Sequence, residues 1–276
     1  MKYALKAVKY GTKNSIKAII FAMIPALFVG LFVNPYCLSK FFAVYPDLKV
    51  TNYLSMFNAF FDFDWQNVVL IVLGCALVIF MLSIVFGLIE RHMRTGKFSL
   101  SESSSMFNNN IMVVAIYFVV IILLYMFSVF IISLLTYCLH LLISGMGKVP
   151  TDVNIAVSFV FTAILFLVFF RIAMLLFLSI PETITTGYSM SNCINEVSVA
   201  MGKKSRSIYI AYILPMFLHF PLNILSYGLW WNKLIGVLLL AFYIIYYCSL
   251  TYIVYFDINN IERKDVTTFN FRFFKR

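Results

Sequence analysis

One residue carries a charge in an apolar setting: Arg171 is the only charged residue in the run 153–180. A guanidinium keeps its proton, so at membrane depth it must contact carbonyl groups, a carboxylate or water. Residues of this kind either form a functional site or hold helices together. We therefore treat Arg171 as a candidate site, with Glu90 and Glu182, or exposed carbonyl groups, as its possible partners.

Two further carboxylates, Asp62 and Asp64, are spaced as in some Mg²⁺ or Mn²⁺ sites of lipid-processing enzymes. No third ligand or general base lies near them in the sequence. Their aromatic neighbours, Phe61, Phe63 and Trp65, are typical of a membrane-interface belt. The sequence therefore predicts neither a catalytic centre nor a metal or cofactor site.

The cysteines and histidines show no spacing typical of metal or redox sites. Cysteine behaves as a small apolar residue when it is buried, so we expect free thiols. We expect the histidines to serve structure. The residues concerned are Cys37, Cys75, Cys138, Cys193, Cys248, His92, His140 and His219.

Composition places these residues in a membrane: 63% of the chain is hydrophobic, 12% is charged, and the mean hydropathy is +0.95. A spanning helix needs about 20 apolar residues. Runs of suitable length occur at 18–33, 68–89, 111–143, 153–180, 208–229 and 234–256. The sequence predicts an all-α, polytopic membrane helix bundle with six transmembrane helices. The third run is long, so it either tilts strongly or turns into the interface near His140.

Basic residues are distributed unevenly along the chain, whose formal net charge is +10. Lys and Arg are retained on the cytoplasmic side of spanning helices. With a cytoplasmic N-terminus, the opposite side receives only Lys40, Lys49, Lys148 and Lys233. This predicts a plasma-membrane protein with both termini cytoplasmic. The charge indicates anionic lipid headgroups as partners, and not nucleic acid.

The N-terminal segment carries lysines at helical spacing, which places them on one face of a helix. These are Lys2, Lys6, Lys9, Lys13 and Lys17. The face is either an ordinary basic flank of a span or a helix that lies on anionic headgroups, and we favour the second. No cleavage site follows the apolar run, so we expect it to remain as the first span. The predicted organisation is a basic amphipathic helix at 1–17, a membrane domain at 18–256 and a basic tail at 257–276.

Two cytoplasmic loops each predict a short interfacial helix. Ser99 and Glu102 form a capping-box pattern in the first loop. The second loop, 189–206, contains Glu196, Ser198 and then Gly202 before a basic cluster. Both helices contain a Glu-x-Ser pattern, which indicates a possible internal repeat. Since both copies run in the same direction, the repeat would be parallel.

The region 68–227 resembles a group of bacterial six-helix membrane proteins of unknown function, related to the membrane domain attached to some glycerophosphoryl diester phosphodiesterases. The residues that carry the resemblance are Arg171, Pro181, Glu182 and the helix with Glu196. The resemblance implies the fold more than a function, because its motifs are short and no soluble phosphodiesterase sequence is present.

The second loop also resembles the coupling loop of permease subunits of ABC importers. Glu196, Gly202 and Leu214-Pro215 fall at similar spacing, although Val197-Ser198 replaces the usual small pair. This resemblance implies a separate ATPase as partner, because the chain has no phosphate-binding loop.

Tyrosines recur at helical spacing in the run 234–256, and their hydroxyl groups are expected to serve helix packing. They are Tyr243, Tyr246, Tyr247, Tyr252 and Tyr255. The sequence as a whole predicts a non-enzymatic integral membrane protein that takes part in transport or lipid handling. An ABC permease-like subunit and an envelope immunity or stress protein are the alternatives.

Overall fold

A computed structural model describes residues 2–29, 37–61, 68–97, 103–147, 149–226 and 232–266. The regular elements of these residues are all helices. They are α1 (Lys2–Phe28), α2 (Cys37–Val44), α3 (Tyr53–Phe60), α4 (Val68–Thr95), α5 (Ser103–Gly145), α6 (Thr151–Thr186), α7 (Met190–Met201), α8 (Ser205–Ser226) and α9 (Asn232–Ile258), with short 3-10 helices η2 (Tyr45–Asp47) and η4 (Gly202–Lys204).

Four helical segments are long and apolar enough to cross a membrane: Ile71–Thr95, Phe107–Gly145, Thr151–Thr186 and Leu234–Ile258. They correspond to four of the predicted runs and agree with a helical membrane bundle. The apolar part of α1, Ile19–Phe28, is shorter.

Helix α1 continues without a break from Lys2 to Phe28, so the expected terminal helix and the first apolar run form one element. It packs most extensively against α9. Tyr3, Ala7 and Tyr10 are buried on that side, whereas Lys9 is exposed on the other. The lysine spacing thus predicted the correct helix face. The opposite, apolar face packs on protein, and contact of the lysine face with anionic headgroups stays a prediction.

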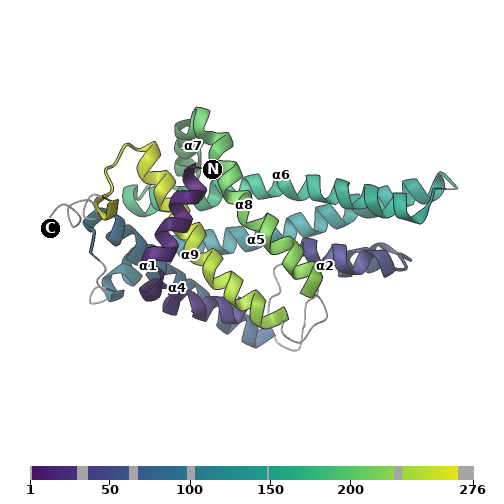
Figure 1. The fold of residues 1–276 in the computed structure, drawn as a ribbon, viewed down its shortest axis with the longest axis horizontal. Coiled ribbons are helices and arrows are strands. Elements are labelled where there is room, and N and C mark those ends of the chain that lie inside the picture. Colours follow the sequence, from purple (N-terminus) through teal and green to yellow (C-terminus); the bar gives the residue numbers. More distant parts are fainter. Residues whose placement is uncertain are drawn as a thin grey trace.

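Buried side chains form two main clusters. The larger one, here called the core, combines residues of α1, α4, α5, α6, α7, α8 and α9. The second one, here called the arm, joins the distant halves of α5 and α6 to α2, η2 and α3. Figure 1 shows the α5–α6 hairpin extending past the other helices, with α2 beside it.

The hairpin is longer than a membrane is thick. Helix α5 has 43 residues and α6 has 36, which correspond to about 64 Å and 54 Å. Helix α5 passes His140 as a continuous helix, so the predicted turn into the interface does not occur there. Helix α6 passes Pro181, the expected end of its span, and ends five residues later at Thr186.

The two loops differ in structure. Residues 99 and 102 lie outside the described residues, and from Ser103 onward the chain belongs to the long helix α5. The second loop does contain a separate helix, α7, as predicted, which Gly202 ends with a φ of 37°. The parallel repeat is therefore not confirmed.

The segment between the first two apolar runs contains helices that we did not predict. Asn52 and Ser55 form a capping box at the start of α3, in which the Asn52 side chain accepts a hydrogen bond from the Ser55 amide at 2.9 Å. Helix α3 then packs against α5. Asp62 and Asp64 lie outside the described residues.

One end of the core collects the N-terminus of α1 and the C-terminal ends of α4, α6 and α9. Hydrogen bonds join Tyr3 to Asp257 and Asn259 to Glu182 across these elements. The Lys204 side chain binds Asp257 of α9 at the same end, so η4 and the start of α8 belong to it as well. We call this the basic end, because α1, α4, η4, the start of α8 and the segment after α9 carry the following cations: Lys2, Lys6, Lys9, Arg91, Arg94, Lys203, Lys204, Arg206, Arg263 and Lys264. The structure thus brings together four segments that the charge pattern assigned to one side.

Candidate functional site

The tyrosines of α9 hold α8 through its backbone. Pro215 has no N–H group, so it leaves the carbonyl of Ala211 without its helical partner. The Tyr246 hydroxyl donates to that carbonyl at 2.6 Å. Tyr243 and Tyr247 donate to two other carbonyls of α8, at 3.2 and 3.0 Å. The expected packing role of these tyrosines is confirmed.

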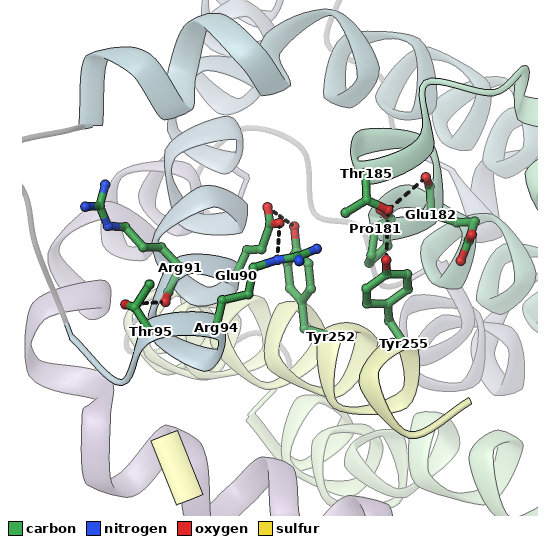
Figure 2. Close-up of polar contacts among 9 residues, drawn as sticks. All are labelled: Glu90, Arg91, Arg94, Thr95, Pro181, Glu182, Thr185, Tyr252 and Tyr255. Carbon is green, nitrogen blue, oxygen red and sulfur yellow. Dashed lines mark hydrogen bonds and ion pairs between the residues drawn. The ribbon is translucent and has the colours of Figure 1, made fainter. Parts of the chain in front are cut away.

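Glu90, one of the proposed partners of Arg171, instead joins α4 to α9. Its carboxylate accepts a hydrogen bond from Arg94 at 2.8 Å and one from the Tyr252 hydroxyl at 3.4 Å (Figure 2). The guanidinium of Arg94 also lies over the ring of Phe256, 5.7 Å from its centre. Glu90 therefore has a structural role at the basic end.

Glu182 joins α6 to the segment after α9, since its carboxylate accepts a hydrogen bond from Asn259 at 3.0 Å. One turn further along α6, Thr185 lies 2.9 Å from the Tyr255 hydroxyl (Figure 2). Tyr252 and Tyr255 thus bind different helices from neighbouring turns of α9. Neither Glu90 nor Glu182 forms an ion pair with Arg171 among the described residues.

Asp257 forms a third polar junction, which the sequence did not reveal. It accepts hydrogen bonds from Tyr3 at 2.6 Å and from Lys204 at 2.8 Å. Burial, followed by the hydrogen bond to Asp257, raises the pKa of Tyr3. Burial and the charge of Lys2 lower the pKa of Lys6 nearby. The junction offsets part of the repulsion among the crowded cations.

Two histidines also form structural hydrogen bonds. His92 lies 3.0 Å from the Tyr10 hydroxyl in the core, and His140 lies 3.1 Å from the Tyr45 hydroxyl in the arm. Each pair joins helices that are distant in the sequence. The side chain of His219 lies outside the described residues.

Arg171 is exposed on α6 and forms no hydrogen bond or ion pair with a described residue. It interacts electrostatically with Tyr209 of α8. The Tyr209 hydroxyl donates to the carbonyl of Leu167, one turn before Arg171, at 2.7 Å. Arg171 therefore lies where α8 crosses α6.

Arg171 also lies at the end of an apolar surface. Exposed large apolar side chains on α6 extend from Val153 to Ile172. Beyond that point, Met174, Leu178 and Pro181 are buried in the core. Because α6 continues to its end at Thr186, the guanidinium is separated from that end by about 22 Å of helix.

The residues of the expected coupling loop are dispersed. Helix α7 packs on α6, with Cys193 and Val197 buried, and exposes Glu196 and Ser198. Gly202 follows α7 directly. Leu214 and Pro215 belong to the interior of α8, which begins at Ser205, and not to its start.

No family model matches the sequence, and no match is found among curated proteins or solved structures. Both family resemblances therefore remain predictions. The four long apolar helices indicate a membrane protein. Within it, Arg171 and its surroundings are the candidate functional site.

Proposed function

We propose that this chain is a non-enzymatic integral membrane protein that handles lipid or assists transport in a bacterial plasma membrane. The observation that carries the proposal is Arg171, an exposed cation that forms no ion pair with a described residue and lies at the edge of an apolar surface. A cation in this position has a use when an anionic group of the membrane reaches it.

The proposed topology has six spans, with α1 and α8 added to the four long apolar helices. The basic end lies in the cytoplasm, together with both termini and α7. The concentration of Lys and Arg at this end supports the orientation, because translocation across the membrane disfavours basic segments.

The use of the carboxylates supports a non-enzymatic role. Glu90, Glu182 and Asp257 each accept a hydrogen bond from a different helix or from the segment after α9. Each of these half-buried carboxylates has a structural partner and holds the basic end together.

Lipid analysis of the purified protein tests the function. We expect native mass spectrometry of protein released from membranes to detect bound phospholipid, with anionic species enriched over their share in the membrane. Protein with no such enrichment would contradict lipid handling. A stoichiometric ATPase that co-purifies would favour the permease-like alternative.

Cysteine labelling tests the topology separately. Ser198→Cys reports on α7 and Asp152→Cys on the tip of the arm, since both positions are exposed. In a background without native cysteines, we expect a membrane-impermeant maleimide to label Asp152→Cys in intact spheroplasts and Ser198→Cys only after lysis. The reverse pattern would invert the proposed orientation.

A further inference from the structure

Two helices present a cation followed by an apolar stripe where they cross. On α6 the stripe contains Arg171, Val168 and Ile164, at helical spacing. All three side chains are exposed. The apolar part leads away from the basic end.

Helix α8 repeats this pattern. Arg206 lies one turn before Tyr209, and the exposed residues Ile210, Leu214 and Phe217 follow Arg206 on the same face. Arg206 forms no hydrogen bond or ion pair with a described residue. The hydrogen bond from Tyr209 to α6 therefore brings together two helices that each carry an unpaired cation and an apolar stripe.

We infer that this crossing binds an anionic phospholipid, with the phosphate on Arg171 and the acyl chains along the exposed stripes of α6 and α8. The inference rests on the proposed function and names the ligand of its site. A guanidinium suits this role because it donates two parallel hydrogen bonds to one phosphate. Arg206 supplies a second positive charge, which favours a headgroup with net negative charge over a zwitterionic one.

Phosphate binding also explains why a cation lies beside exposed apolar residues at this crossing. An unpaired guanidinium beside lipid chains is unfavourable, and a phosphate removes that cost. The Tyr209 hydroxyl is engaged with the Leu167 carbonyl, so it fixes the crossing and leaves Arg171 as the donor for the lipid. The apolar stripes remain covered by acyl chains.

The test uses the full chain in nanodiscs that contain equal amounts of phosphatidylglycerol and phosphatidylcholine, and native mass spectrometry counts the lipids that remain bound. We expect Arg171→Gln to lose about tenfold in retained phosphatidylglycerol, the scale of one charge-assisted contact. Arg171→Lys should retain part of the binding, and Arg206→Gln should reduce the preference for phosphatidylglycerol. Lys9→Gln removes an exposed charge elsewhere at the basic end and serves as the matched control.

The outcomes separate the site from the function. If wild-type protein prefers phosphatidylglycerol and Arg171→Gln binds as much of it as Lys9→Gln, the site is wrong while lipid handling stands. If wild-type protein shows no preference, the proposed function fails as well. Equal loss of both lipids in Arg171→Gln would refute the preference for net negative charge. A change of oligomeric state in Arg171→Gln would identify the crossing as a contact between copies of the chain.

Discussion

The core and the arm stabilise the same hairpin by different means. In the core, α5 and α6 pack with helices from both ends of the chain, and charged side chains such as Glu90 and Glu182 join them. In the arm, they pack with the short segment that contains α2 and α3. There the rings of Phe41 and Phe60 stack with their centres 4.3 Å apart.

Their polar contacts differ accordingly. In the arm, neutral pairs join α6 to its neighbours, such as Thr136 with Thr162 at 3.0 Å and Tyr45 with Ser158 at 3.1 Å. The Lys40 ammonium of α2 donates to the Asn58 carbonyl of α3 at 2.8 Å. Neutral hydroxyl pairs are tolerated at membrane depth, whereas charges are costly there. The comparison shows that ion pairs such as Arg94–Glu90 and Lys204–Asp257 lie at the basic end of the core, whereas the hydroxyl pairs of the arm join neutral groups.

The largest expected effect concerns the independence of the arm. Phe41→Ala removes a fully buried ring, which costs about 3–5 kcal/mol. We expect hydrogen exchange to rise in α2 and α3 and to stay unchanged in α9. Leu54→Ala, at an exposed position of α3, is the control. Faster exchange throughout the core would show that the two regions unfold as one.

A smaller effect is expected in the core, at the carbonyl that Pro215 leaves without a partner. Tyr246→Phe removes the donor to the Ala211 carbonyl and should cost about 1–3 kcal/mol. In a Pro215→Ala background the backbone N–H returns, so the same substitution should cost less. Thermal denaturation of the four proteins in one detergent gives this double-mutant cycle. If Tyr246→Phe lowered the stability equally with Pro215 and with Ala at that position, the Tyr246 hydroxyl would not compensate for the missing N–H group of Pro215.

The contact between Tyr3 and Asp257 should give a modest, pH-dependent effect of about 1 kcal/mol. Because folding raises the pKa of Tyr3 above its ordinary value of 10.0, the stabilisation is present below that pH and is lost above it. Wild-type protein should therefore lose more stability than Tyr3→Phe as the pH rises from about 9 to 11. Parallel denaturation curves would contradict this, since the other tyrosines are common to both proteins.

The smallest effect is expected on α7. Glu196 is exposed and forms no contact with a described side chain, so Glu196→Gln should change stability by no more than about 0.5 kcal/mol. The same variant tests the permease-like alternative. Loss of a co-purifying ATPase at unchanged stability would support coupling through α7.

Periodicity and composition predicted much of the fold because they depend on neighbours in the sequence. The lysine spacing gave the exposed face of α1, and the pattern around Gly202 gave the end of α7. The capping box of α3, Asn52 followed by Ser55, is an equally local pattern, but it was not predicted.

The partners of the polar residues were not predictable. Tyr3 and Asp257 are 254 positions apart, so no local pattern connects them. Glu90 and Glu182 were expected near Arg171 because opposite charges attract. The helix crossings instead give each carboxylate a hydrogen-bond donor from α9 or the segment that follows it. The sequence pattern singled out Arg171, but its place at the crossing with α8 required the tertiary structure.

The packing of α1 against α9 also has a consequence for biosynthesis. The ribosome completes α1 before every other described helix and α9 after all of them. The buried face with Ala4, Ala7 and Tyr10 therefore lacks its final partner while the intervening helices insert. The core can therefore close over that face only after α9 has been synthesised.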